Sequence, residues 1–149
     1  SNTKSTFSSI IKVFKIPSIS DDTGLFTDAL NGEPGVFSAR YSGEDATYVS
    51  NCSKLLEKLG EVPFEKRTAY FETVICFYIN EDNYHFFRGI CKGNIDIEMK
   101  GKNGFGYDPL FVPEGFKKSF AEMKDEEKNK ISHRALALNN FADYIRSNY

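Results

Sequence analysis

Two adjacent carboxylates, Asp21 and Asp22, open the run Asp-Asp-Thr-Gly and are candidates for metal chemistry. Hard cations such as Mg²⁺ prefer carboxylate oxygens, and ligand sites in open α/β sheets favour the carboxyl ends of strands. Residues 18–22 are predicted to form a short strand that Thr23 and Gly24 close as a turn, which would put both carboxylates at such an end. Since adjacent strand residues face opposite sides, one carboxylate is expected to point into a pocket and the other to bind backbone donors. A plain turn is the alternative.

A second candidate segment, residues 101–109, combines three glycines, two aromatic rings and one carboxylate. Glycines let backbone N–H groups approach an anion or a flat ligand closely. The rings of Phe105 and Tyr107 could stack on a base, and Asp108 could accept hydrogen bonds from it. The glycine spacing G-x-x-G-x-G, with no Gly-Lys-Ser/Thr after it, matches neither a Walker loop nor a dinucleotide-binding fingerprint. The alternative is an irregular turn whose aromatic rings pack in the core.

Polar and cationic donors gather near the C-terminus, where Lys128 precedes Ser132, His133 and Arg134. We expect all four in one helix, with the first two on one face and the others rotated away, so that a ligand lying across the helix could meet several of them. A solvated helix face is the alternative. Because the second histidine, His85, falls in another predicted element, a histidine metal site is improbable. No G-x-S-x-G elbow supports a serine-histidine-aspartate triad, so any hydrolysis is expected to be metal-assisted.

Helices are predicted at three places along the chain. Apolar residues at helical spacing over 7–14, ahead of Pro17, predict a short amphipathic helix. A second apolar stripe predicts a helix over 49–59, with Asp45 as a possible N-cap and Gly60 at its exit. Ser119 and Glu122 form a capping box for a short helical turn, and Asp125 is expected to cap a longer helix that continues to residue 145.

Strand-forming residues lie between these helices. β-Branched and aromatic residues over 68–79, turn formers at 80–83 and a further strand-like run over 84–91 predict a long hairpin. Residues 95–99 are expected to add another strand. Together the elements predict an α/β or α+β fold with a mixed sheet, as a single domain over residues 1–149.

Composition excludes several classes of protein. The chain has 149 residues, is 40% hydrophobic and contains 14 Phe and 8 Tyr, so it can bury a core and is not intrinsically disordered. A net charge of −2 argues against non-specific binding of nucleic acid, and the apolar run at 74–79 is too short to cross a membrane. The first residues carry no signal-peptide pattern. Cys52, Cys76 and Cys91 are expected to be buried thiols in a reducing compartment. We therefore expect a soluble, cytoplasmic protein without nucleic-acid or membrane partners.

Four segments of the chain together resemble one family. They are SDDTGL at 20–25, PGVFSARYSGEDAT at 34–47, GFGYDPLF at 104–111 and EEKNKISHRALAL at 126–138. Their order and approximate spacing are similar to those of the non-canonical purine nucleoside-triphosphate pyrophosphatases, also called inosine triphosphate pyrophosphatases. The resemblance covers essentially the whole chain from the first predicted helix onwards, and it favours the ligand-site interpretation of each candidate segment.

The resemblance implies an enzyme that hydrolyses ITP, dITP or XTP to the monophosphate and pyrophosphate with Mg²⁺, for nucleotide-pool cleaning. It also implies a homodimer whose protomers have an α/β fold with two lobes around a nucleotide cleft. Asp22 resembles the family's metal ligand and the base that takes a proton from the attacking water, and Asp21 resembles its neighbouring metal-binding acid. The positions that resemble nucleotide contacts are Thr23, Phe105, Gly106, Tyr107, Asp108, Lys128, His133 and Arg134. A donor such as Arg134, aimed at a 6-keto oxygen, would oppose the 6-amino group of adenine donor to donor.

The start of the chain departs from the family's pattern. Family members normally begin with a strand and a T/S-G-N-x-x-K loop that wraps the triphosphate, whereas residues 1–4 contain no glycine and lie close to the first predicted helix. We therefore expect the chain to lack the family's N-terminal triphosphate-binding segment, and with it part of the electrostatic positioning that phosphoryl transfer needs. A non-catalytic nucleotide-binding relative or an inactive fragment is the alternative. A hydrolase of modified pyrimidine nucleotides is a third hypothesis, against which GFGYD and SHR argue.

Overall fold

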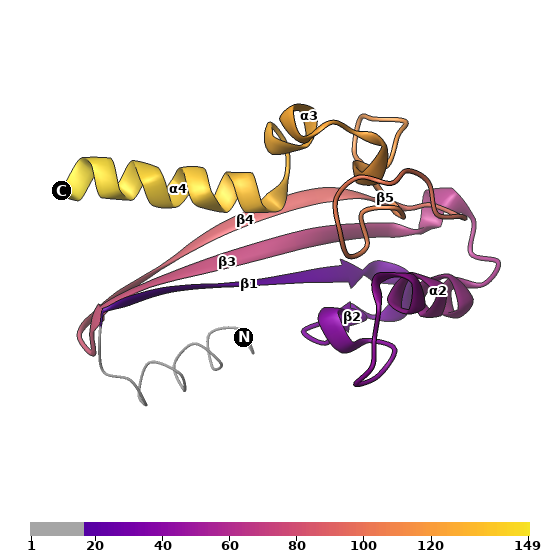
Figure 1. Ribbon diagram of the computed structural model, residues 1–149, viewed down its shortest axis with the longest axis horizontal. Coiled ribbons are helices and arrows are strands. Elements are labelled where there is room, and N and C mark those ends of the chain that lie inside the picture. Colours follow the sequence, from indigo (N-terminus) through magenta and orange to yellow (C-terminus); the bar gives the residue numbers. More distant parts are fainter. Residues whose placement is uncertain (1–16) are drawn as a thin grey trace.

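The computed structural model describes residues 17–149, which are built around one five-stranded sheet (Figure 1). The sheet has the order β2-β1-β3-β4-β5, and every neighbouring pair in it is antiparallel. The strands are β1 (Ser18–Thr27), β2 (Pro34–Gly35), β3 (Thr68–Asn80), β4 (Asn83–Ile95) and β5 (Phe111–Pro113). The helices are α2 (Tyr48–Leu59), α3 (Asp125–Asn129) and α4 (His133–Asn148). The α/β class is confirmed, although the mixed sheet that the sequence predicts is antiparallel throughout the described part. The helix predicted over 7–14 lies outside the described residues.

The predicted hairpin is confirmed as β3 and β4, whereas the strand predicted over 95–99 is wrong. Ile95 ends β4, and the sheet continues instead with β5, which pairs with β4 at Gly93–Ile95. Burial explains the choice, because Phe111 is fully buried in β5 while Ile97 is 62% exposed. The apolar run that packs into the core takes the place beside β4.

The strand that carries the two aspartates is longer than predicted. β1 continues through Thr23 and Gly24 to Thr27, and it pairs with β3 along its whole length, from Ser18 opposite Tyr78 to Thr27 opposite Ala69. Both the predicted turn at Asp-Asp-Thr-Gly and the predicted strand end are therefore wrong. The reason is tertiary, since a long partner strand supplies hydrogen bonds that the local turn propensity cannot match.

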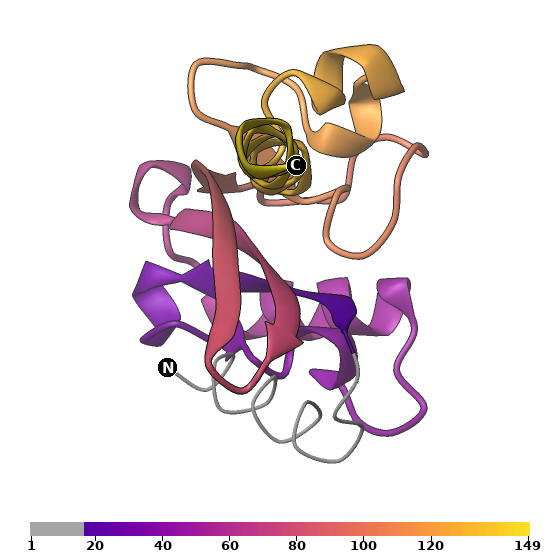
Figure 2. The same ribbon diagram turned by 90° about the vertical axis from the view of Figure 1, so that its left-hand side faces the viewer.

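One face of the sheet carries the larger core and both of the longer helices. Strand residues alternate between faces, so Leu25 of β1 and Phe71 of β3 share a face. Buried residues of α2, Cys52, Leu55 and Leu59, belong to the same core cluster as Leu25 and Phe71. Further along β3 on that face, the Phe77 ring packs against Phe141 of α4, with ring centroids 5.6 Å apart. In Figure 1, α4 lies along one half of the sheet and α2 lies at the other end. Figure 2 shows the twisted sheet and α4 end-on.

The helix ends correct two local predictions. Thr47, not Asp45, caps α2 by accepting a hydrogen bond from the Ser50 backbone N–H at 3.0 Å. Gly60 ends the helix as predicted, with a φ of 52°. The single helix expected from residue 125 to 145 is broken, because Ser132 accepts a hydrogen bond from the Ala135 N–H and starts α4 afresh. The predicted capping box of the short turn at Phe120–Glu122 is confirmed.

The expectation that the cysteines are buried thiols is met. The three cysteines are buried and free. Across residues 17–149, every helix is too short or too polar to cross a membrane.

Candidate functional site

A cavity of about 1030 Å³ lies on the face of the sheet that also carries α2 and α4. Its floor includes Thr23, Leu25 and Phe71. One wall comes from the segment 38–51 and includes the start of α2, and the opposite wall comes from residues 104–108, α3 and the first turns of α4. A cavity of this size accommodates a ligand as large as a nucleotide. The two walls correspond to the two lobes around a cleft that the resemblance implies.

All the side chains and backbone positions predicted to contact a nucleotide line this cavity. They come from β1, from the loop before β5, and from α3 and the start of α4. They are Thr23, Phe105, Gly106, Tyr107, Asp108, Lys128, His133 and Arg134. The fold therefore brings together residues that are more than a hundred positions apart in sequence. Their roles toward a ligand remain predictions.

The base of the glycine-rich loop is fixed by backbone contacts. The Lys100 N–H donates to the Pro109 carbonyl at 2.9 Å and closes the loop. The Asn103 N–H donates to the Ala121 carbonyl at 2.9 Å. Gly101 is required at this approach, because a Cβ there would collide with the Ala121 backbone and its φ of 91° disfavours other residues. The loop thus stands on the short helical turn that precedes α3.

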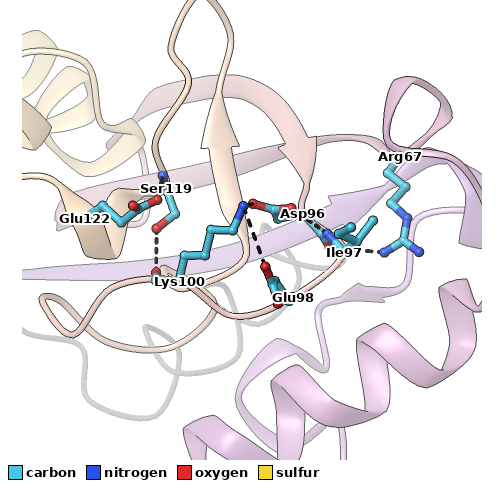
Figure 3. A network of polar contacts seen from close by, with 7 residues as sticks. All are labelled: Arg67, Asp96, Ile97, Glu98, Lys100, Ser119 and Glu122. Atoms are coloured by element: carbon cyan, nitrogen blue, oxygen red, sulfur yellow. Dashed lines mark hydrogen bonds and ion pairs between the residues drawn. The ribbon is translucent and has the colours of Figure 1, made fainter.

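A polar network below the loop ties it to the end of the sheet (Figure 3). The buried Arg67 guanidinium donates to the Asp96 carbonyl at 3.1 Å, and the Asp96 carboxylate pairs with the Lys100 ammonium at 3.3 Å. The Ser119 hydroxyl donates to the Lys100 carbonyl at 2.7 Å, and the Ser119 N–H donates to the Glu122 carboxylate at 2.9 Å. These contacts hold the loop on a rigid base.

The two rings at the tip of the loop have different surroundings, and the sequence did not predict this difference. Phe105 is 51% exposed in the cavity, whereas Tyr107 is 5% exposed and donates its hydroxyl hydrogen bond to the Ser38 carbonyl at 2.6 Å. The prediction that both rings offer stacking surfaces is therefore wrong for Tyr107, which anchors the loop to the opposite wall. One oxygen of Asp108 accepts bonds from the Phe105 N–H at 3.0 Å and from Lys128 Nζ at 2.6 Å. Asp108 thus braces the loop internally.

Two cations lie close to the exposed ring. Lys128 Nζ lies 4.9 Å from the centroid of the Phe105 ring, and Arg134 Cζ lies 5.8 Å from it. Both distances are within the range of cation–π attraction. A flat, electron-rich or anionic group entering the cavity therefore meets an aromatic surface and two positive charges at the same place.

His133 is the first residue of α4, not an interior helix residue as predicted, and its ring is 7% exposed. It stacks on Phe71 with ring centroids 4.4 Å apart. Burial, with the nearby charges of Lys128 and Arg134, lowers the pKa of His133 to about 3. Its Nδ1 is buried without a hydrogen-bond partner among residues 17–149. His133 is therefore a neutral imidazole at neutral pH, and the positive charge of this wall resides on its two neighbours.

The two aspartates lie on opposite faces of β1, as alternation requires. Asp21 is on the cavity face, where its carboxylate pairs with Arg134 Nη2 at 3.4 Å. Asp22 lines a small hollow on the other face together with Gly24, Glu72 and other residues. Side chains on opposite faces of a strand diverge, as expected from the sequence, and the metal-binding roles of Asp21 and Asp22 remain predictions. Burial raises the pKa of Asp22, and a hydrogen bond from the Thr23 N–H partly opposes that effect.

The cavity and the Asp22 hollow share lining residues on β1. Both are lined by Thr23 and Gly24. β2 pairs with β1 only at Leu25 and Phe26, so within the described residues the edge of β1 before Leu25 has no strand beside it. A ligand in the cavity can therefore extend around this edge toward Asp22.

The sequence interpretation missed the wall opposite the loop. Thr47, Tyr48 and Asn51 at the start of α2 line the cavity with Ser38. Asn51 donates to the Ser38 carbonyl at 3.3 Å and also holds Ser42. The sequence did contain a signal for this wall, because the helix begins where the second segment that resembles the family, residues 34–47, ends.

Comparisons with known proteins identify the family of the chain and agree with its fold. The sequence model of the Ham1 family matches residues 1–144. A dITP/XTP pyrophosphatase of Thermoanaerobacter pseudethanolicus is 54% identical over 127 residues, which cover 85% of this chain and 64% of that protein. One from Porphyromonas gingivalis is 50% identical over 90% of this chain and 68% of its own length. The chain thus spans a little under two thirds of the first of these relatives.

Solved structures give the same result. The Ham1 protein of Staphylococcus aureus superimposes with a TM-score of 0.88 at 38% identity, over 95% of this chain and 73% of that chain. A HAM1 protein from Coxiella burnetii superimposes with a TM-score of 0.84 at 40% identity, over 90% of this chain and 69% of that one. With its matched sequence and its shared fold, the chain belongs to the Ham1 family.

Proposed function

We propose that this chain is the nucleotide-binding part, or the whole, of an enzyme that hydrolyses ITP, dITP and XTP to the monophosphate and pyrophosphate, and so cleans the nucleotide pool. Relatives at 54% and 50% identity are named dITP/XTP pyrophosphatases. The observation that carries the proposal is the exposed Phe105 ring close to Lys128 and Arg134 in a nucleotide-sized cavity. A purine can stack on the ring while the cations meet its carbonyl groups and phosphates.

Arg134 gives the site a reason to prefer 6-keto purines. A guanidinium N–H can donate to the 6-keto oxygen of hypoxanthine or xanthine, whereas the 6-amino group of adenine presents a donor to a donor. A hydrogen bond to a charged group contributes about 2 kcal/mol, so its loss changes affinity by roughly 30-fold. The neutral His133 beside it can offer a ring nitrogen to the base without adding charge.

Catalysis is assigned to Asp22. With the base in the cavity, the phosphates pass the edge of β1 at Thr23 and Gly24, which line both the cavity and the Asp22 hollow. Asp22 is then placed to orient the attacking water and to accept its proton at the carboxylate. Asp22 is an exposed residue, but the partial burial of its carboxylate raises the pKa and so makes it a better proton acceptor than an aspartate of ordinary pKa.

The residues present fit a magnesium site that a substrate completes. Among residues 17–149, no three or more His, Cys, Asp or Glu side chains gather in a way that could hold a metal ion by themselves. Mg²⁺ commonly uses one or two carboxylates and takes its other ligands from water and substrate phosphates. Asp22 would be the carboxylate of such a site, because Asp21 faces the other way and pairs with Arg134. When bound, the ion supplies neutralisation of phosphate charge and a lowered pKa of bound water.

We further propose that the protein acts as a homodimer in the cytoplasm. The buried, free cysteines are compatible with a reducing compartment. The uncovered edge of β1 in the described residues is one place where another strand could pair. Light scattering after size-exclusion chromatography at several concentrations tests the dimer.

The test of the function is pyrophosphate release from ITP with Mg²⁺, with ATP as the comparison substrate. The 149-residue chain is measured beside Asp22→Asn and beside Asp82→Asn, which removes the same charge in the turn between β3 and β4. We expect ITP-selective release that Asp22→Asn abolishes and Asp82→Asn leaves unchanged. Equal release from ATP, or release that Asp22→Asn does not affect, would contradict the proposal. Binding of ITP without release would favour the non-catalytic alternative.

A further inference from the structure

Asp21 makes a contact that its expected role as a metal ligand does not explain. Its Oδ2 lies 3.4 Å from Arg134 Nη2, and so joins the cavity face of β1 to the first turn of α4. We infer that Asp21 is a positioning residue for base recognition, which holds the Arg134 guanidinium in the direction of the purine. The inference rests on the proposed function, since it concerns the 6-keto purine site of the same cavity.

The Asp21 carboxylate is carried by a rigid strand, β1. Asp21 lies opposite Ile75 within the continuous β1–β3 ladder, two residues before Thr23 and on the same face. Thr23 itself is tied to Thr73 of β3 through their hydroxyl groups, 2.9 Å apart. The position of the Asp21 carboxylate is therefore set by the sheet and not by a loop.

The orientation of the Arg134 side chain depends on its contact with Asp21, because Arg134 is less constrained than His133 and Lys128. His133 is held by burial and by its stack on Phe71, and Lys128 is held by its 2.6 Å pair with Asp108. Arg134 is half exposed, and in the described part of the chain its partners are Asp21 and the Phe105 ring. The carboxylate and the ring come from separate elements, so together they restrict the direction of the guanidinium.

The ion pair leaves donors free for a base. It engages Nη2, and within residues 17–149 the remaining N–H groups of Arg134 make no hydrogen bond. These groups can meet a 6-keto oxygen while Nη2 stays on Asp21. Without Asp21 the guanidinium gains rotamers, and its charge is free to turn toward the phosphates, which every nucleotide carries. The expected consequence is weaker discrimination between bases with little loss of general nucleotide affinity.

The experiment measures binding of IMP and AMP to the full 149-residue chain by calorimetry in the presence of EDTA. Monophosphates without metal separate base recognition from catalysis and from any metal site. We expect Asp21→Asn to lower the ratio of IMP to AMP affinity by roughly three- to tenfold, as the loss of one half-exposed orienting contact allows. The charge-matched Asp82→Asn is expected to leave the ratio unchanged, and Asp21→Glu is expected to keep most of it.

A second arm tests whether Asp21 acts through Arg134. In an Arg134→Gln background, Asp21→Asn should have no further effect on the IMP to AMP ratio. A further fall in that background would overturn the inference, because Asp21 would then act on the base by another route. A thermal melt of each variant verifies that the folded fraction is the same.

The outcomes separate the inference from the function on which it rests. If the unmodified chain binds IMP and AMP equally, the proposed base preference fails. If it prefers IMP and Asp21→Asn keeps the full preference, the positioning role is wrong and the proposed function stands. If Asp21→Asn keeps the preference but weakens Mg²⁺-dependent binding of ITP, Asp21 is a metal ligand as the family resemblance implies, and the inference is likewise overturned.

Discussion

Acid is expected to destabilise this protein through one buried histidine, His133. In the folded chain burial and two nearby cations lower the pKa of His133 to about 3, from an ordinary value of 6.5. Below pH 6.5 the unfolded chain therefore binds a proton that the folded chain does not bind until about pH 3. Since the unfolded state binds more protons in this window, the contribution of His133 to stability is present above pH 6.5 and is lost as the pH falls.

The size of the effect follows from the two pKa values. Between pH 7.5 and pH 5.0, proton binding by the unfolded histidine alone lowers the free energy of unfolding by about 2 kcal/mol. At pH 5.0 the folded His133 is still neutral, because its pKa is about 3. Substitution by Gln removes the titrating group and retains a polar side chain of similar length.

The assay is urea denaturation of the unmodified chain and of His133→Gln at both pH values. Because other groups titrate in this range, the informative quantity is the difference between the two proteins at each pH. We expect His133→Gln to lose about 2 kcal/mol less than the unmodified chain between pH 7.5 and 5.0. His85→Gln, the same substitution at the second histidine, is the control, and it should retain the loss caused by His133.

One result would refute this reasoning. If the unmodified chain and His133→Gln lose the same free energy of unfolding on acidification, His133 is not held neutral. Its ring would then have to reach water or an acceptor at the start of α4, in conflict with its burial against Phe71.

Three further substitutions test the packing and polar contacts around the cavity. Gly89→Ala should lower stability by about 1–3 kcal/mol or more, because a Cβ there would collide with the backbone of the first turn of α4; an unchanged thermal midpoint would show that this approach is looser. Lys128→Met should cost about 3–5 kcal/mol by leaving the buried Asp108 carboxylate unpaired, and Asp108→Asn in the same chain should restore part of that loss in urea denaturation. Tyr107→Phe should cost about 1 kcal/mol through loss of its hydrogen bond to Ser38; no measurable change would argue against the anchoring role of the hydroxyl.

The local elements were largely predictable because their signals are local. The β3–β4 hairpin follows from a strand-forming run on each side of turn residues, and α2 follows from an apolar stripe that ends at Gly60. The capping box at Ser119 and Glu122 needs only the spacing of two side chains. Where the competing signal came from elsewhere in the chain, prediction failed. Thr23 and Gly24 have the composition of a turn, but pairing with β3 keeps them in a strand.

For the candidate site too, some features were predictable from the sequence and others were decided only by the tertiary structure. Residue types and their order already indicated the segments, so Phe105, Lys128 and Arg134 could be singled out from the sequence. The sequence could not show which of the two rings faces a ligand, because Phe105 and Tyr107 are both aromatic and lie in the same loop. Only the packed structure buries Tyr107 against Ser38 and leaves Phe105 in the cavity.

The two aspartates show most clearly what each level determines. The sequence alone determines that Asp21 and Asp22 are adjacent and, once they lie in a strand, that they must face opposite sides. It does not determine which face becomes the cavity. That is decided by where α2 and α4 pack, since these helices cover the face of Asp21 and bring Arg134 to it. Burial of apolar surface between distant segments makes that choice, and no spacing within a single segment encodes it.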